Sequence, residues 1–79
     1  MKKDELKIDN KVKAKFRKYG VHTIIGTITE ICEDEHALDG TWVGIKVTGG
    51  DRNDKVVNAM IWYKHSVLVP LKDVMEVLQ

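Results

Sequence analysis

Strict alternation of apolar and polar residues is the first clear pattern along the chain. In residues 11–18, Val12, Ala14 and Phe16 share one side and basic residues occupy the other. Because successive side chains of a strand point to opposite faces, this pattern predicts a half-buried strand with a positively charged outer face. Residues 41–48 alternate in the same way and predict another strand, whose inward residues are Val43, Ile45 and Val47.

Three further segments are rich in residues that favour strands. Residues 22–32 are mostly β-branched, and Gly26 within them indicates a bend or a bulge. Residues 55–64 are apolar on both faces of an extended chain, which we interpret as a fourth strand. Residues 65–70 form another apolar segment, which Pro70 ends because proline cannot continue a ladder.

The C-terminal tail fits two periodicities. Leu71, Val74, Met75 and Leu78 have helical spacing, whereas Val74, Glu76 and Leu78 alternate as in a strand. We expect a single 3₁₀ turn at 71–73 and a short strand at 74–78. Charged residues at 33–39 and the sequence GGDRND at 49–54 predict loops between elements.

A chain of 79 residues forms one domain. Several short strands separated by turn signals predict an all-β fold, and the compact solution at this length is a small five-stranded SH3-like barrel with one 3₁₀ turn near the C-terminus. Residues 1–10 are polar and are expected to form a flexible N-terminal arm, with the barrel over 11–79.

The composition of the chain indicates in which cellular compartment the protein is expected. Cys32 is the single cysteine, so no disulfide framework is expected, and a lone thiol fits a reducing compartment. The chain has neither a long apolar run nor a charged start followed by an apolar segment, so we expect no membrane association and a cytoplasmic location.

Charge is distributed unevenly although the formal net charge is only +1. Residues 1–18 hold 8 of the 13 basic residues, and residues 30–39 hold five acidic residues and no basic one. Lys11, Lys13, Lys15 and Arg17 would follow one another about 7 Å apart on one strand face, close to the phosphate spacing of a nucleic-acid strand. The same lysines could instead protect a sheet edge from aggregation.

The sequence lacks the patterns of known catalytic and metal sites. It contains no G-x-S-x-G, H-E-x-x-H or phosphate-binding glycine motif. Cys32 and His36 are separated by a charged turn without a third orienting residue, and the acidic stretch between Cys32 and Asp39 lacks zinc or calcium spacing. We therefore expect no enzyme activity, no cofactor and no metal.

Large aromatic residues suggest a binding surface. Trp42 and Trp62 lie opposite the main apolar stripes of their expected strands, where either a second layer covers them or they form an exposed patch with Met60. In the second case the patch would bind a partner, with charge for an acidic ligand supplied by Lys46 and Arg52. The predicted partner-binding residues are Trp42, Lys46, Arg52, Asn53, Asp54, Trp62 and Tyr63.

Several motifs resemble one family in the same order along about residues 11–78. The stretch GTWVGIKV resembles the G-x-W-V-G-V core of the CAP-Gly domains, which bind microtubules and microtubule plus-end proteins. Gly26-Thr27-Ile28 resembles the family's early G-T-V, Asn53-Asp54 the N-D of its glycine-rich loop, and HSVLVPLKDVMEV its last strands. Tyr63 lies where the family has an aromatic residue.

This resemblance implies an SH3-like barrel and a groove for acidic C-terminal peptides that end in an aromatic residue. It would place Trp42, Asn53, Asp54 and Tyr63 around that groove. The chain departs from the family pattern at four positions, which are Asp51, Arg52, Lys55 and Ser66. Because a missing glycine can forbid a positive φ, the barrel carries over more directly than the pocket does.

Three functions follow from these observations. The first is a non-enzymatic module that binds a peptide or loop of a partner protein. The second is a nucleic-acid-binding barrel that uses the basic residues of 11–18. The third is a small homo-oligomeric scaffold or inhibitor, which would pair through the two-faced strand expected at 55–64.

Overall fold

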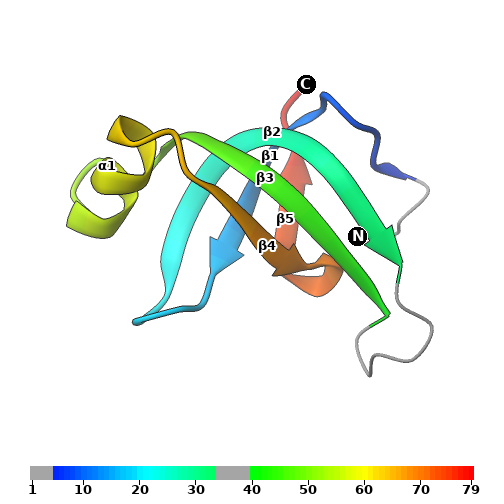
Figure 1. Ribbon diagram of the computed structural model, residues 1–79, viewed down its shortest axis with the longest axis horizontal. Coiled ribbons are helices and arrows are strands. Elements are labelled where there is room, and N and C mark those ends of the chain that lie inside the picture. Colours follow the sequence, from blue (N-terminus) through cyan, green and yellow to red (C-terminus); the bar gives the residue numbers. More distant parts are fainter. Residues whose placement is uncertain (1–4, 34–39) are drawn as a thin grey trace.

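The computed structural model describes residues 5–33 and 40–79 and shows five antiparallel strands in one sheet (Figure 1). The strand order is β4-β3-β2-β1-β5, and the sheet curls so that β4 comes close to β1. The predicted small all-β fold with a 3₁₀ turn near the C-terminus is confirmed. The elements are β1 (Lys11–Phe16), β2 (His22–Glu33), β3 (Thr41–Gly50), α1 (Lys55–Trp62), β4 (Ser66–Pro70), the 3₁₀ turn η2 (Leu71–Asp73) and β5 (Val74–Val77).

The core lies on the concave side of this sheet, where the alternating apolar positions meet. Val12 and Ala14 of β1 are fully buried, as are Ile24 and Ile28 of β2. The inward residues predicted for β3 are buried as well, and Val57 of α1 and Val69 of β4 close the cluster. Period-2 patterning therefore fixed which face of each strand is covered, since a slip of one residue would expose the whole set.

Gly26 allows β2 to bend, as the sequence predicts. The pairing of β2 with β3 shifts register between Ile25 and Gly26, and again between Ile28 and Glu30. A Cβ atom at Gly26 would collide with the backbone carbonyl of Lys46 on β3. The glycine is thus required for a close approach of two backbones at a bulge, which lets a long strand serve both halves of the curled sheet.

Residues 55–64 are not the strand that the sequence predicts, because residues 55–62 form the helix α1. Asp54 caps the helix, and its side chain accepts hydrogen bonds from the backbone N–H groups of Val56 and Val57. Val57 and Met60 are buried, at the i, i+3 spacing of one helical face. A run that is apolar on both faces fits a strand or a helix equally well, and the N-cap aspartate was the local signal that favoured the helix.

The described part of the expected N-terminal arm, residues 5–10, packs on the sheet. Leu6 is buried in the core. The backbone N–H of Asp9 donates to the Ile28 carbonyl at 2.9 Å, and the Ile28 N–H donates to the Asn10 carbonyl at 2.9 Å. These contacts extend the β1–β2 pairing by a few residues, so the packed domain begins before residue 11.

Candidate functional site

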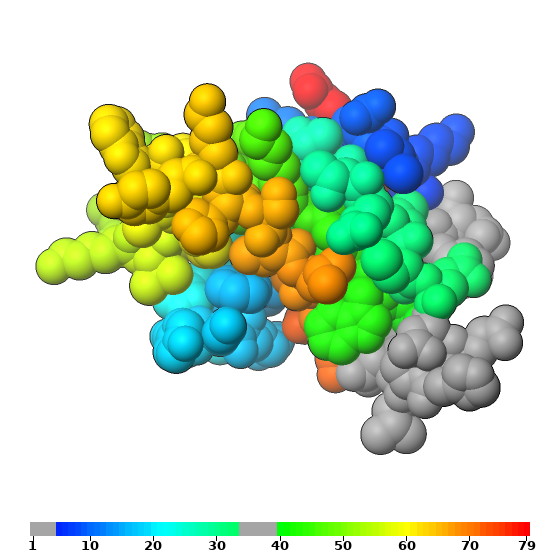
Figure 2. Space-filling view, viewed as in Figure 1, coloured from blue at the N-terminus to red at the C-terminus, as the bar shows by residue number. Residues whose placement is uncertain are grey.

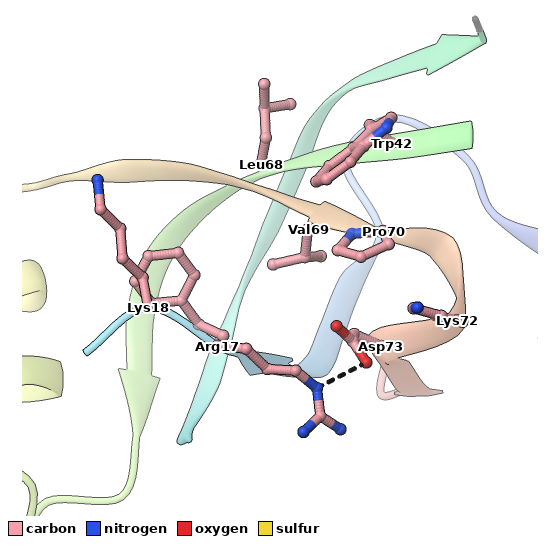
Figure 3. Close-up of a pocket in the computed structure, with 9 residues that line it drawn as sticks. Arg17, Lys18, Trp42, Leu68, Val69, Pro70, Lys72 and Asp73 are labelled. Atoms are coloured by element: carbon pink, nitrogen blue, oxygen red, sulfur yellow. Dashed lines mark hydrogen bonds and ion pairs between the residues drawn. The ribbon is translucent and has the colours of Figure 1, made fainter. Parts of the chain in front are cut away.

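A groove with a volume of about 390 Å³ lies between the free edge of β4 and the C-terminal end of β1 (Figure 3). In the space-filling view, β4, the β1–β2 turn and the start of β3 meet on one face (Figure 2). Three segments that are distant in the sequence, residues 16–18, 42 and 68–73, therefore contribute to one hollow. Its lining residues are Phe16, Arg17, Lys18, Trp42, Leu68, Val69, Pro70, Lys72 and Asp73.

The apolar wall of the groove follows from the β3–β4 register. Trp42 is the cross-strand neighbour of Pro70, and Gly44 is the neighbour of Leu68. Directly opposed residues project from the same face of a sheet, so Trp42 and Pro70 lie side by side there. Leu68 remains 50 % exposed and Trp42 is half-buried. The result is an apolar surface that the chain itself covers only in part.

Basic side chains form the opposite wall. Arg17 Nε lies 3.1 Å from Asp73 Oδ1, and the Arg17 side chain is 56 % exposed while that of Asp73 is 7 % exposed. The aspartate thus fixes the direction of the guanidinium and leaves most of it in contact with solvent (Figure 3). Lys18 Nζ lies 5.5 Å from the ring centroid of Tyr19. With Lys72 on η2, this wall holds three cationic groups and one carboxylate.

The structure separates the predicted partner-binding residues into two groups. Trp42 is the second residue of β3, whereas Arg52, Asn53 and Asp54 follow the other end of this strand, roughly 26 Å away along it. Trp62 and its C-cap neighbour Tyr63 lie at the end of α1, which is near the second group (Figure 1). Trp62 is 79 % exposed and Tyr63 is 70 % exposed. The single predicted patch is therefore wrong in its geometry, because residues 55–62 form a helix beyond the far end of β3.

Lys46 lies between the two groups. It is exposed on the face of β3 that carries Trp42, four residues further along the strand. Its cross-strand neighbours are Thr27 on β2 and Ser66 on β4. Lys46 therefore extends the surface beside Leu68 and adds a positive charge beyond the groove.

Asp54 has a role that the sequence interpretation missed. Its Oδ2 lies 2.5 Å from Nδ1 of His22, while its Oδ1 accepts from Val56 N at 2.9 Å and from Val57 N at 3.4 Å. The resemblance placed Asp54 in a ligand loop, but its carboxylate is occupied within the chain. It joins the start of β2 to the start of α1.

His22 is buried and has acceptors at both ring nitrogens. Nε2 lies 3.0 Å from the Lys18 carbonyl and 3.1 Å from the Tyr19 carbonyl. Both nitrogens donate when the ring is an imidazolium. The hydrogen bond that the ring donates to Asp54 is the main factor that raises the pKa of His22 above its ordinary value, whereas desolvation opposes this rise. The same hydrogen bond lowers the pKa of Asp54. The pair is a cross-link between the β1–β2 turn and the helix, and it is an ion pair whenever His22 is protonated.

The basic stripe predicted on 11–18 is divided. Lys11, Lys13 and Lys15 occupy the outer face of β1, and Glu76 of β5 is the cross-strand neighbour of Lys13. Arg17 lies beyond the end of β1 and pairs with Asp73 at the groove. Because β1 lies between β2 and β5, its lysines do not protect a sheet edge, contrary to one expectation from the sequence. Binding of nucleic acid by Lys11, Lys13 and Lys15 stays a prediction.

The remaining candidate residues for catalysis or metal binding belong to the acidic stretch between Cys32 and Asp39. Residues 34–39, which include His36 and Asp39, lie outside the described residues. Cys32 is exposed, and desolvation followed by the nearby Glu30 carboxylate raises the pKa of its thiol. Within residues 5–33 and 40–79, no cluster of histidine, cysteine and acidic side chains could hold a metal ion. The same residues contain no helix with the length and apolar character needed to cross a bilayer.

Sequence reasoning did not identify most of the groove. The sequence pattern assigned Phe16 to the core and Pro70 to the end of a strand, and it assigned no functional role to Leu68 or Asp73. Pro70 and Trp42 are 28 positions apart, and only the antiparallel β3–β4 register brings them together. The recognisable local signal was an exposed-type residue, Pro70, that ends an apolar strand and is followed, after Leu71, by Lys72 and Asp73.

Comparisons of the chain with protein-family models, with curated proteins and with solved structures found no match.

Proposed function

We propose that this protein is a non-enzymatic module that binds an acidic peptide segment of a partner protein in the groove between β4 and the end of β1. The observation that supports it is the composition of that groove. Trp42, Leu68 and Pro70 form its apolar wall, and Arg17 and Lys18 form its basic wall. Such a combination of aromatic anchor and flanking charge is typical of peptide-binding surfaces.

Each wall would have a distinct task. An apolar side chain of the ligand would bury surface against Trp42 and Pro70, which are already fixed by strand pairing and lose little entropy on binding. A ligand carboxylate would accept hydrogen bonds from Arg17, whose guanidinium is held in place by Asp73. Lys18 and Lys46 would add long-range attraction for an acidic segment.

This proposal differs from the patch expected from the sequence in its location. The earlier set combined Trp42 with Trp62, Tyr63 and the loop before α1, whereas the proposal keeps Trp42 and Lys46 and adds the residues of β4. The CAP-Gly resemblance stays a prediction. Trp42 is the one residue that belongs both to the groove implied by that resemblance and to the groove proposed here. The cytoplasmic location predicted from the lone Cys32 is part of the proposal as well.

The hypothesis of a homo-oligomeric scaffold or inhibitor no longer has the strand on which it depended. It required a two-faced strand at 55–64 that could pair with a second copy. Those positions form α1 and its C-terminal cap, so they do not provide a strand that could pair with a second copy. The peptide module is the function for which the structure offers a partly covered surface.

The proposal is tested by selecting peptides from a displayed library of random short sequences on the immobilised wild-type protein. We expect enrichment of peptides that combine an apolar residue with aspartate or glutamate. The tightest selected peptide, synthesised with a fluorophore, then serves as the probe for anisotropy titrations. Trp42→Ala should weaken its binding about tenfold or more, as expected for a central aromatic contact.

Trp62→Ala provides the competing arm of the same experiment. It removes an equally large aromatic residue at the other end of the molecule. Loss of binding in Trp62→Ala with retention in Trp42→Ala would place the site on α1 and overturn the groove. Absence of any enriched peptide would count against the module itself.

A further inference from the structure

The free edge of β4 offers backbone groups to a ligand, and this can be deduced from the pairing of β4 with β3. In an antiparallel pair, alternate residues exchange both hydrogen bonds with their neighbour, and the residues between them point their N–H and C=O groups to the other side. The N–H of Val47 donates to the His65 carbonyl at 3.0 Å, so these two residues form a hydrogen-bonded pair.

The register then assigns the direction of every residue of β4. Val67 is paired with Ile45 and Val69 with Val43, so the backbone groups of Val67 and Val69 face β3. Ser66 and Leu68 lie between them, so their N–H and C=O groups face away from β3. In the described part of the chain β4 has no strand on that second side.

That second side is the floor of the groove. Leu68, Val69 and Pro70 line it from β4, and Arg17 and Lys18 line it from across the gap (Figure 3). The outward backbone of Leu68 therefore lies between the apolar wall and the basic wall. Pro70 has no N–H, so a ladder that runs along this edge ends there.

We infer that the partner segment binds as an added β-strand, which pairs its backbone with Leu68 and Ser66 at the edge of β4 and directs acidic side chains to Arg17 and Lys18. This inference rests on the proposed function and specifies the conformation of the ligand. The occupant is an extended acidic peptide because the facing wall is basic, and an extended chain matches the five-residue length of β4.

An added strand would contact the protein through its backbone as well as through its side chains. Backbone pairing provides affinity with little dependence on sequence, and alternate side chains of the added strand then face the same way. Those that face the outer surface of the sheet would reach Trp42 and Leu68. The intervening ones would face the space beside Val69, between β4 and the end of β1.

The first test compares two substitutions at one position. Leu68→Pro removes the outward N–H and the side chain, whereas Leu68→Ala removes the side chain and keeps the N–H. Neither change touches a hydrogen bond to β3, because the backbone groups of Leu68 face away from it. With the selected peptide as probe, we expect Leu68→Pro to bind about fivefold more weakly than Leu68→Ala, the typical contribution of one hydrogen bond.

The second test uses the wild-type protein and does not depend on the folding of a variant. Amide hydrogen exchange is measured by NMR with and without the selected peptide. We expect the amides of Leu68 and Ser66 to exchange rapidly in the free protein and at least about tenfold more slowly in the complex. Val67 and Val69 are the matched controls, because their amides are already protected by β3.

The outcomes separate the inference from the function on which it rests. Equal binding by Leu68→Pro and Leu68→Ala, or unprotected Leu68 and Ser66 amides in the complex, overturns strand addition. If Trp42→Ala still weakens binding in that case, the groove remains the site and the ligand binds through side chains alone. If no peptide is selected, both the function and the added strand are wrong.

Discussion

The two ends of the molecule each present a tryptophan, in different surroundings. Trp42 is half-buried beside Pro70 in a groove with a basic wall. Trp62 is 79 % exposed at the end of α1, and Tyr63 follows it with 70 % exposure. The difference shows that an aromatic residue is a candidate anchor for a ligand when neighbouring elements hold it in a groove. Exposure alone does not make an aromatic residue such an anchor.

The helix end has its own specialisation, which is structural. His22, Asp54 and the carbonyls of Lys18 and Tyr19 form a connected cluster that ties α1 to the β1–β2 turn. Lys18 also lines the groove, so the same turn belongs to both ends. One end of the molecule thus carries a stabilising cluster, and the other end carries the proposed binding groove.

The largest effect is expected for Asp54→Ala. This change removes the N-cap of α1 and the partner of the buried His22, so the cap alone should lower Tm by about 4–8 °C. Asp54→Asn is the matched control, because the amide oxygen can still cap the helix, and it should lower Tm less. Thermal unfolding followed by circular dichroism measures both. An unchanged Tm in Asp54→Ala would mean that the helix end is not a stabilising cluster.

A change of pH should affect stability less than Asp54→Ala does. It removes the charge of His22 or of Asp54, but the Asp54 side chain stays at the N-terminus of α1. The pKa of His22 is raised from 6.5, so its contribution is complete below pH 6.5 and is lost as the pH rises through the folded-state pKa. The pKa of Asp54 is lowered from 3.8, so its contribution is present above pH 3.8 and is lost as the pH falls through the folded-state value. Stability from this pair should therefore be greatest between these limits.

The measurement is the free energy of unfolding in urea across acidic, neutral and alkaline buffers. His22→Gln should flatten the alkaline decline seen in the wild type. His65→Gln changes an exposed histidine instead and should leave the profile as it is. Identical profiles for the wild type and His22→Gln would show that the imidazolium does not stabilise the fold.

The two tryptophans should also differ in their contribution to stability. Trp42→Ala exposes half-buried apolar surface around Pro70 and should destabilise the fold by about 1–2 kcal/mol, less than a fully buried aromatic residue would. Trp62→Ala should stay within about 0.5 kcal/mol, as is typical of exposed positions. Urea denaturation of both variants makes the comparison directly. Equal losses would indicate that Trp62 is covered in solution.

The smallest effect is spectroscopic. Trp62→Phe leaves Trp42 as the single tryptophan, and Trp42→Phe leaves Trp62. The emission of Trp42 should lie at shorter wavelength and be quenched less by acrylamide, because Pro70 and the groove shield its ring from water. Reversal of this order would contradict the contrast between the two ends.

Much of the fold could be predicted from local patterns. The alternation in β1 and β3 identified their buried faces, Gly26 marked a real bulge, and the 3₁₀ turn at 71–73 has the predicted bounds. Residues 55–62 were misassigned because apolar residues on both faces satisfy either period, and the interpretation did not use Asp54 as an N-cap. The candidate site was predicted only at Trp42, Lys46 and, as part of another hypothesis, Arg17.

The local residue pattern was enough to predict the composition of each strand face, because side-chain direction along a strand depends only on position within that strand. It did not determine which faces and edges become neighbours. Three contacts depend on the order and curl of the strands and on the helix between β3 and β4. They are Trp42 with Pro70, Arg17 with Asp73, and His22 with Asp54. These contacts join residues that are 28 to 56 positions apart, so they exist only once the sheet and the helix have taken their places in the fold.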